Sequence, residues 1–551
     1  MNEPVIRNGG RLVVEALVAH GVDTAFAVPG ESYLEVLDAL HDQTSIRLVG
    51  CRQEGGAAYM AEAYGRLTGR PGVCLVTRGP GATNASIGVH TADQGSTPMV
   101  LFVGQVPTDH QGKEAFQEVD YCSFFADLAK WVVEVKNPDD IPAVVNQAFA
   151  VAQQGRPGPV VVALPEDVLR AETTSPVLAT IVVKEKIPAT ADLNQLVDLL
   201  AHAQRPVVLA GGGGWTNESR HILTTWANQN ELPVVVSFRR HDLFDNTTES
   251  YAGEAGVGMP APVRETLARA DLIIALGVRF GEMTTNAYTL FNDPQQKIVH
   301  VHASAEEFSK VVVPVLAIEA GPNAMMAALS DVSLSQGIGG SWRSEARQRF
   351  LSTQEVEPPA SGVDMAVVTK HLQKVLPSDA IITNGAGNFA VWPNKFFLYG
   401  AEATLLAPQN GTMGYGLPAA VAAKVVHPDR TVVCFAGDGD LQMNIQELGS
   451  AQQEAAQPIV LVVNNSTYGT IRMHQERRHP GRVVGTDIVN PDFVTLAQAY
   501  GFYAEQVTNT QDFAGAFERA SASTTGALLN LMVDPNQITP WSTVASLREG
   551  H

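Results

Sequence analysis

The chain has 551 residues, of which 45% are hydrophobic, and its formal net charge is −20 at pH 7. This length predicts about three domains of roughly 150 to 200 residues each. A negative charge of this size repels phosphate backbones and anionic lipids, so we expect no nucleic acid and no membrane partner and favour small-molecule ligands.

The cysteines and the N-terminal segment indicate a reduced, soluble protein. The chain has 4 cysteines at wide spacings and no Cys-x-x-Cys pair, which argues against a disulfide framework and against a thiolate metal site. Residues 1–23 hold no basic segment followed by a long apolar run, and no charge-free apolar window of about 20 residues occurs elsewhere. We therefore expect a cytoplasmic location.

The first third of the chain predicts a parallel α/β domain over residues 1–175. Its short apolar runs end in Gly or Pro, where a strand passes into a loop. These runs are DTAFAVPG (23–30), GVCLVTRGPG (72–81), MVLFVGQVP (99–107) and GPVVVALPEDV (158–168). Helical patterns lie between them, and this alternation is typical of a parallel sheet covered by helices.

Two further units of the same style follow, a middle domain over residues 190–332 and a C-terminal domain over 360–551, with connections near 172–190 and 333–362. The predicted middle strands lie in RPVVLAGGGG (205–214), LPVVVSF (232–238), ADLIIALGVRF (270–280) and KIVHVHAS (297–304). The predicted C-terminal strands lie in AIITNGAGNF (380–389), TVVCFAGDGD (431–440) and PIVLVVNNS (458–466). The predicted fold class is therefore α/β, with three doubly wound parallel-sheet domains.

One predicted strand of the third unit ends in a Gly-rich acidic turn, Gly437-Asp438-Gly439-Asp440. The helical spacing of residues 441–456 places this turn at a helix N-terminus, where free backbone N–H groups attract phosphate. Asp438 adds a negative charge there, which is favourable when a divalent cation bridges the carboxylate and phosphates. Asn465 follows the next strand, so its amide oxygen reaches the same edge of the sheet. The two ends of this segment predict a Mg²⁺ site that holds a phosphorylated ligand.

The spacing of Gly437-Asp438-Gly439 and Asn464-Asn465 resembles the diphosphate motif of the thiamine diphosphate enzymes. Further segments resemble the acetolactate synthase-like (large subunit) branch of that family, in the same order: CRQEGGAAYMAEAYGRLTG, TRGPGATN, VGQVP, EAFQE and GTMGYGLPAA. The resemblance covers nearly the whole chain. It implies an aminopyrimidine-binding (PYR) domain, a middle domain and a diphosphate-binding (PP) domain. It also implies thiamine diphosphate and Mg²⁺ as cofactors, with Asp438, Asn465 and the carbonyl of Thr467 as metal ligands.

The resemblance assigns further residues to the cofactor. It implies that Glu54 contacts N1′ of the aminopyrimidine, which makes Glu54 the first catalytic candidate. The carbonyl of Gly411 would accept a hydrogen bond from the aminopyrimidine amine, and Met413 would support the bent cofactor. Gly387 and Asn388 match the second diphosphate contact, although a glutamine is more familiar at position 388. The remaining implied cofactor neighbours are Gly437, Gly439, Asp440 and Tyr468.

The activity implied by the resemblance is carboligation, in which pyruvate or a similar 2-oxo acid is decarboxylated and its acyl carbanion is transferred to a second carbonyl. Phe116 and Gln117 match the substrate-facing pair of acetolactate synthases and favour a small acyl donor. Thr470 and His474 stand where those enzymes carry the Met and Trp that line the acceptor pocket. The identity of the acceptor therefore stays open.

Two alternatives stand beside the carboligase. In the loop that begins at Gly30, Glu31 replaces the glycine of acetolactate synthases and matches an aspartate of simple 2-oxo acid decarboxylases, so a non-oxidative decarboxylase that releases an aldehyde is the first alternative. A catalytically silent cofactor-binding or regulatory subunit is the second. Intact Glu54, Asp438 and Asn465 argue against silence.

The resemblance also bears on flavin and on assembly. The Gly-rich turn at 211–214 lacks the full dinucleotide fingerprint, so FAD is disfavoured, although the sequence leaves it open. In this family the cofactor lies between the PYR domain of one subunit and the PP domain of another. We therefore expect a homodimer or homotetramer that takes small-molecule substrates.

Overall fold

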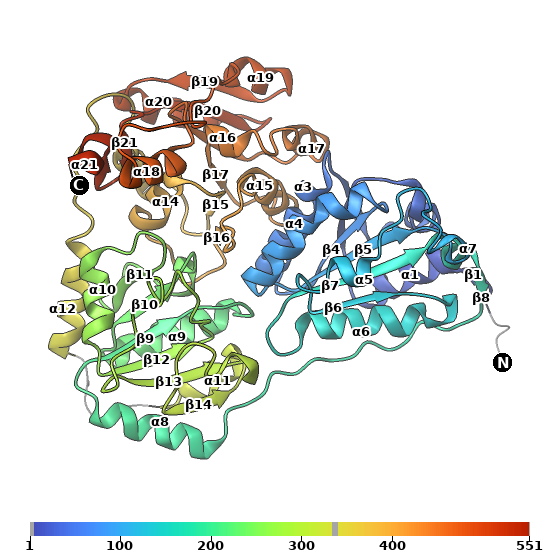
Figure 1. Cartoon of the computed structure of the whole chain (residues 1–551), viewed down its shortest axis with the longest axis horizontal. Helices are drawn as coiled ribbons and strands as arrows, with labels where there is room; N and C mark the ends of the chain where they lie inside the picture. Colours follow the sequence, from blue (N-terminus) through green and yellow to red (C-terminus); the bar gives the residue numbers. More distant parts are fainter. Residues whose placement is uncertain (1–4, 333–339, 550–551) are drawn as a thin grey trace. The chain divides into compact units, whose positions relative to one another are not determined.

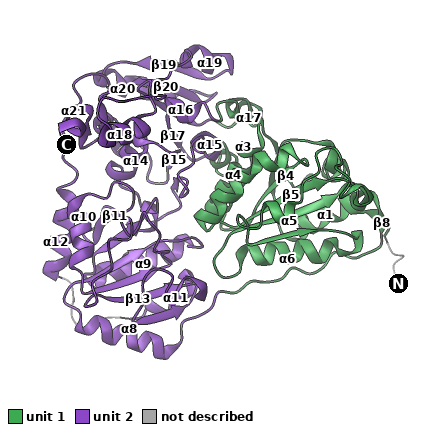
Figure 2. Cartoon of the chain, in the orientation of Figure 1, with its two compact units in different colours: residues 1–184, 421–428, 444–456 green, residues 185–420, 429–443, 457–551 purple. Residues whose placement is uncertain are grey.

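The computed structural model describes residues 5–332 and 340–549, and it contains three six-stranded parallel sheets with helices around each (Figure 1). The chain divides into two compact units (Figure 2). The N-terminal unit comprises residues 1–184, 421–428 and 444–456, and the C-terminal unit comprises residues 185–420, 429–443 and 457–551. The predicted α/β class with three parallel sheets is confirmed.

The sheet of the N-terminal unit has the strand order β3-β2-β4-β5-β7-β6. Its strands are β2 (Thr24–Ala27), β3 (Arg47–Gly50), β4 (Gly72–Val76), β5 (Met99–Gln105), β6 (Trp131–Glu134) and β7 (Pro159–Pro165). A separate ribbon pairs β1 (Arg7–Asn8) with β8 (Glu172–Thr173). The central strands β4, β5 and β7 are buried along their whole length, as their near-continuous apolar sequences predict for a parallel sheet covered on both faces.

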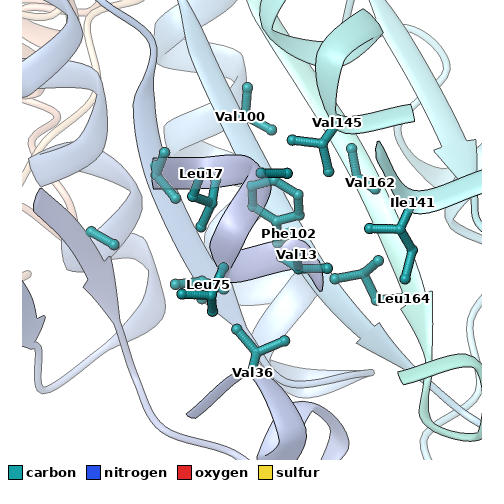
Figure 3. Close-up of a cluster of buried hydrophobic side chains, with 14 of the residues drawn as sticks. Val13, Leu17, Val36, Leu75, Val100, Phe102, Ile141, Val145, Val162 and Leu164 are labelled. Carbon is teal, nitrogen blue, oxygen red and sulfur yellow. The ribbon is translucent and has the colours of Figure 1, made fainter. Parts of the chain in front are cut away.

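Helices cover both faces of this sheet, and their apolar side chains pack against those of the strands to form the core. The helices of this unit are α1 (Gly9–Ala19), α2 (Leu34–Asp42), α3 (Glu54–Thr68), α4 (Pro80–Gly95), α5 (Tyr121–Phe124), α6 (Ile141–Gln153), α7 (Glu166–Arg170) and, from the C-terminal third of the sequence, α17 (Glu447–Gln453). On one face, Leu17 of α1 and Val145 of α6 pack in one cluster with Phe102 of β5 (Figure 3). Each such buried side chain stabilises the fold by about 1.5–3 kcal/mol relative to exposure.

The first sheet of the C-terminal unit has the order β11-β10-β9-β12-β13-β14. Its strands are β9 (Pro206–Ala210), β10 (Val234–Ser237), β11 (Tyr251–Ala255), β12 (Leu272–Leu276), β13 (Lys297–His302) and β14 (Leu316–Glu319). Its helices are α8 (Thr190–His202), α9 (Asn217–Gln229), α10 (Ala261–Arg269), α11 (Pro322–Leu329) and α12 (Gly340–Leu351).

The second sheet of the C-terminal unit has the order β16-β15-β17-β18-β20-β19. Its strands are β15 (Ile381–Asn384), β16 (Leu405–Leu406), β17 (Val432–Gly437), β18 (Ile459–Asn464), β19 (Tyr503–Val507) and β20 (Ala527–Met532), and a hairpin joins β21 (Gln537–Thr539) to β22 (Ser542–Thr543). Its helices are α13 (Met365–Val375), α14 (Val391–Phe396), α16 (Asp438–Leu441), α18 (Gly469–Arg478), α19 (Phe493–Ala499), α20 (Phe513–Ser521) and α21 (Val544–Glu549). Helix α15 (Gly416–Val426) begins in this unit and ends in residues grouped with the N-terminal one.

Two expectations differ from the structure. The single helix expected over residues 441–456 is shorter than predicted, because α16 (Asp438–Leu441) ends where it was to begin and α17 spans only Glu447–Gln453. The predicted connection 333–362 contains α12, whose Trp342 donates its ring N–H to the carbonyl of Pro206 at 3.1 Å, so this helix packs on the middle sheet. Residues 333–339 of that connection lie outside the described residues.

Candidate active site

The predicted residues of the first domain follow neighbouring strands of the N-terminal sheet. Strands β3, β2, β4 and β5 are adjacent and parallel, so the loops after them share the carboxyl edge of the sheet. Glu54 follows β3, Gly30 and Glu31 follow β2, and Phe116 and Gln117 lie in the loop after β5. The sheet order therefore gathers these candidates along one edge.

Glu54 is the first residue of α3 and is half-buried. Gln53 precedes it as the N-cap, and its side-chain oxygen accepts from the N–H of Gly56 at 3.0 Å. Across from α3, the Asn84 amide of α4 donates to Glu54 Oε2 at 2.9 Å. The carboxylate is thus held on one oxygen by a neutral donor, and Asn84 is a contact that the sequence did not single out.

Arg78, which follows β4, connects the loops at this edge. It is 9% exposed and donates to Glu31 Oε1 at 2.8 Å, to the carbonyl of Phe116 at 3.3 Å and to the carboxylate of Glu166. The Glu31 side chain is therefore ion-paired although it is 66% exposed. We had not predicted Arg78, and its only sequence signal is a cation in the loop directly after a buried strand.

The other predicted residues of this edge serve loop packing or face outward. A Cβ on Gly30 would lie 2.4 Å from Thr77 Cβ, so the loops after β2 and β4 approach too closely for a side chain there. Gln117 has a left-handed backbone with φ of 66°. The Phe116 side chain is 75% exposed.

The predicted residues of the third domain likewise follow adjacent strands. Strands β16, β15, β17 and β18 are neighbours and parallel. The loops after them carry Gly411 with Met413, Gly387 with Asn388, the turn at Asp438, and the loop at Asn465 respectively. The carboxyl edge of this sheet therefore collects the predicted diphosphate and metal residues.

Asp438 is a buried carboxylate, 2% exposed. Its Oδ2 accepts from the Asn490 amide at 2.7 Å, and no ion pair with a Lys, Arg or His of residues 5–332 or 340–549 reaches it. Burial raises the pKa of Asp438 above its ordinary value. A buried carboxylate without a cationic partner is costly unless a cation is bound, so this side chain is suited to hold a metal ion.

Hydrogen bonds within the loop after β18 hold Asn465 and Thr467 in place. Asn465 Oδ1 accepts from the N–H of Thr467 at 3.1 Å, and Ser466 between them has φ of 54°. The Thr467 carbonyl accepts from the N–H of Gly469 at 2.8 Å and keeps a second lone pair. Asn490 also donates to Asn464 Oδ1 at 3.0 Å, so one amide ties this loop to Asp438.

These oxygen donors fit Mg²⁺ and a diphosphate. One carboxylate, one amide oxygen and one backbone carbonyl leave the other octahedral positions to phosphate oxygens and water. Among residues 5–332 and 340–549, no group of three or more His, Cys, Asp or Glu side chains forms a metal cluster of another kind. The sequence reasoning missed Asn490, since its amide comes from a loop far along the chain from Asp438.

Asp440 holds two of the predicted cofactor loops together. Its Oδ1 accepts from the N–H of Ala386 at 3.0 Å and from the N–H of Gly414 at 2.9 Å. A Cβ on Gly385 would lie 2.0 Å from the same oxygen, so the carboxylate fills the space that a side chain would need. Burial raises the pKa of Asp440 to about 7. The structure thus gives this predicted cofactor residue a clear part in joining the loops after β15 and β16.

The remaining predicted residues surround the same edge. The Asn388 side chain contacts Thr470 of α18, and Gly387 and Gly437 both lie against the ring of Phe389. The Tyr468 ring packs on Gly439, where a Cβ would lie 2.6 Å from it. Gly411 has φ of 68°, Met413 is half-buried, and His474 of α18 is exposed.

The Gly-rich turn of the middle sheet is closely packed by the protein itself. A Cβ on Gly212 would lie 2.1 Å from the carbonyl oxygen of Gly277, and the Trp215 ring N–H donates to the carbonyl of Gly211 at 2.8 Å. Helix α9 is capped by Thr216, whose side chain accepts from the N–H of Ser219. The expectation about FAD stays a prediction.

The chain is similar to known proteins along most of its length. The thiamine pyrophosphate enzyme N-terminal TPP binding domain matches residues 7–124, the central domain matches 193–329, and the C-terminal TPP binding domain matches 385–531. The acetolactate synthase large subunit of Parasynechococcus marenigrum (strain WH8102) is 33% identical over 93% of this chain and 85% of its own length. The acetolactate synthase isozyme 2 large subunit of Escherichia coli (strain K12) is 32% identical over 96% of each chain. The mitochondrial acetolactate synthase catalytic subunit of Saccharomyces cerevisiae is 30% identical over 96% of this chain and 80% of its own.

Proposed function

Because the chain belongs to the thiamine pyrophosphate (thiamine diphosphate) enzymes, in their acetolactate synthase-like branch, we propose that it is a carboligase that decarboxylates pyruvate or a similar 2-oxo acid and joins the acyl unit to a second carbonyl. The observation that carries this proposal is the buried Asp438 carboxylate, which has no cationic partner among the described residues and lies in a chain similar to acetolactate synthase large subunits over most of its length.

The residues of the C-terminal unit would hold the diphosphate end. Asp438, the Asn465 amide oxygen and the Thr467 carbonyl would bind Mg²⁺, and the loop at Gly387 and Asn388 would face the phosphates. Asn490 orients Asp438 through its amide, and Asp440 fixes the loops. These contacts support the proposed roles because each ligand is already held by a second protein group.

Glu54 of the N-terminal unit would serve the aminopyrimidine. When bound, thiamine diphosphate supplies a nucleophilic carbon and an electron sink for decarboxylation. The Glu54 carboxylate would hold and share a proton at N1′ of the aminopyrimidine, while Asn84 keeps its other oxygen in place. Gly411 and Met413 would receive the aminopyrimidine amine and support the ring.

The ion pair of Glu31 favours carboligation over simple decarboxylation. A proton donor to the acyl carbanion needs a carboxyl group that is free to reach the carbanion, whereas Arg78 holds the Glu31 side chain at 2.8 Å. Phe116 and Gln117 would contact the donor, and Thr470 and His474 would border the acceptor. The acyl carbanion would then add to a second carbonyl more readily than it takes up a proton.

Assembly follows from the family resemblance. We propose a homodimer or homotetramer in which the residues around Glu54 of one chain and those around Asp438 of another serve one cofactor. The chain would then be inactive as a monomer. Sedimentation analysis with and without cofactor checks the oligomeric state.

The proposal is tested by product analysis with ¹³C-labelled pyruvate, thiamine diphosphate and Mg²⁺, with and without an added aldehyde. We expect acetolactate or a mixed acyloin as the main labelled product. Free acetaldehyde as the main product would instead establish the decarboxylase. Absence of CO₂ together with an unaccelerated exchange of the thiazolium C2 proton would establish the silent subunit.

A further inference from the structure

The segment between Asp438 and Asn465 contributes residues to both compact units. Strand β17 and helix α16 belong to the C-terminal unit, whereas residues 444–456, with α17, group with the N-terminal unit (Figure 2). The two proposed metal ligands therefore stand at the ends of a segment whose middle forms part of the unit that carries Glu54.

Helix α17 is joined to the start of α3 by a buried carboxylate. Glu447 is 0% exposed, and its Oε1 accepts from the backbone N–H groups of Arg52 at 3.1 Å and Gln53 at 3.0 Å. Its Oε2 accepts from Ser450 Oγ at 2.6 Å. A Cβ on Gly56 would lie 2.6 Å from Glu447 Oε1, so the glycine of α3 makes room for this side chain. Glu447 thus caps the beginning of α3 from another part of the chain.

Two further side-chain contacts join the end of α17 to the residues that precede α3. The Arg52 guanidinium donates to Gln453 Oε1 at 3.0 Å, and Arg47 pairs with Glu454 at 2.8 Å. The Arg47 side chain is 46% exposed, so solvent reaches this pair and weakens it. Glu454 therefore offers a matched control, since it docks α17 without touching the backbone before Glu54.

We infer that Glu447 is a positioning residue for Glu54, because it fixes the backbone from which the proposed catalytic carboxylate projects. Glu54 follows Gln53 directly, and its carboxylate is held on the far side by Asn84 at 2.9 Å. Removal of the Glu447 carboxylate deprives two N–H groups of their acceptor, and the start of α3 must shift to satisfy them. This inference rests on the proposed role of Glu54.

The test compares Glu447→Ala, Glu447→Gln and the control Glu454→Gln in the full-length protein with thiamine diphosphate and Mg²⁺. The readouts are kcat, the exchange rate of the thiazolium C2 proton, the cofactor dissociation constant and the melting temperature. We expect Glu447→Ala to lower kcat and the exchange rate about 100-fold while cofactor affinity changes by less than about threefold. Glu447→Gln keeps an oxygen for the two N–H groups and should retain most activity, and Glu454→Gln should match the wild type.

Equal exchange rates in the wild type and Glu447→Ala, with both folded by circular dichroism, would overturn the inference. An equal loss in Glu454→Gln would also overturn it, because docking of α17 alone would then explain the effect. If Glu447→Ala does not fold, Glu447→Asp replaces it in the test, because its shorter side chain draws the carboxylate away from the two N–H groups. The same criteria then apply to Glu447→Asp. If Glu54→Gln leaves exchange unchanged, the proposed function fails; if only Glu54→Gln affects exchange, the positioning inference alone fails.

Discussion

Asn388 and Thr470 are joined by two hydrogen bonds of 3.0 Å, one from the N–H of Asn388 to Thr470 Oγ1 and one from Thr470 Oγ1 to Asn388 Oδ1. The pair connects the loop after β15 to the first turn of α18. The contact therefore joins a residue that we expect at the diphosphate to one that we expect at the acceptor.

Thr470→Val removes both hydrogen bonds while keeping the side-chain shape. The freed loop must then be ordered by the cofactor, so we expect its dissociation constant to rise about tenfold, from two bonds worth about 0.5–1.5 kcal/mol each. Calorimetric titration with Mg²⁺ present measures this. Thr495→Val, which removes the hydroxyl bonded to Asp492 at 2.7 Å, is the control and should bind normally. Unchanged affinity in Thr470→Val would show that the pair does not support the cofactor loop.

Asp438→Asn should abolish Mg²⁺-dependent cofactor binding, because the substitution removes the only charged ligand of the proposed metal site. Asn490→Ala should weaken binding about 10–100-fold, as expected when a group that orients a metal ligand is lost. The measurement is cofactor affinity over a range of Mg²⁺ concentrations. Asp492→Asn controls for loss of a carboxylate, since Asp492 caps α19. Normal binding by Asp438→Asn would disprove the metal assignment.

Glu31→Gln should leave the ratio of acyloin to aldehyde unchanged, because Arg78 holds the Glu31 carboxylate in an ion pair at 2.8 Å. Stability should change by less than about 1 kcal/mol, as is usual for an exposed ion pair. Chromatography of the products from labelled pyruvate gives the ratio. A selective drop in acetaldehyde would identify Glu31 as a proton donor and revive the decarboxylase.

The pH dependence of stability should depend on Glu476 of α18. Arg548 of α21 donates to both of its oxygens, at 2.9 and 2.6 Å, and holds the pKa of Glu476 at about 2. A pKa below the unfolded value of 4.5 means that this stabilisation is present above pH 4.5 and is lost as the pH falls toward 2. Urea midpoints of the wild type and Glu476→Gln should therefore differ at pH 7 and converge below pH 4.5.

The control for this titration is Glu505→Gln, whose partner Arg519 is 57% exposed. We expect a smaller difference from the wild type at pH 7, since exposed pairs are well solvated. A gap between wild type and Glu476→Gln that stays constant from pH 7 to pH 3.5 would mean that Arg548 does not act through the charge of Glu476.

The strands that could be predicted are the central ones. Runs such as MVLFVGQVP became β5 because a strand buried on both faces must be apolar throughout. Edge strands such as β19, YAEQV, carry polar residues on their open side and gave no comparable signal. Helix α12 was missed because its surroundings read as a linker, although Trp342, Ala346 and Phe350 recur at the spacing of one helix face.

Candidate site residues could be proposed from the sequence only where a residue follows the end of a predicted strand. Asp438 and Asn465 could be proposed from the sequence because parallel strands deliver their carboxyl ends to one edge. Arg78, Asn84, Asn490 and Glu447 were not, because each acts through a partner distant in sequence. Such contacts depend on how loops pack, and periodicity and motif spacing carry no information about that.

Glu54→Gln tests the account most directly. The substitution keeps the size of the side chain and its contact with Asn84 but removes the shared proton, so turnover of pyruvate should fall about 10²–10⁴-fold. Mg²⁺-dependent binding of thiamine diphosphate should stay near normal, since the proposed metal ligands are untouched. Exchange of the thiazolium C2 proton in the bound cofactor, followed by NMR, should fall with turnover. Near-normal turnover and exchange in this variant would contradict the assignment of Glu54 and the proposed function with it.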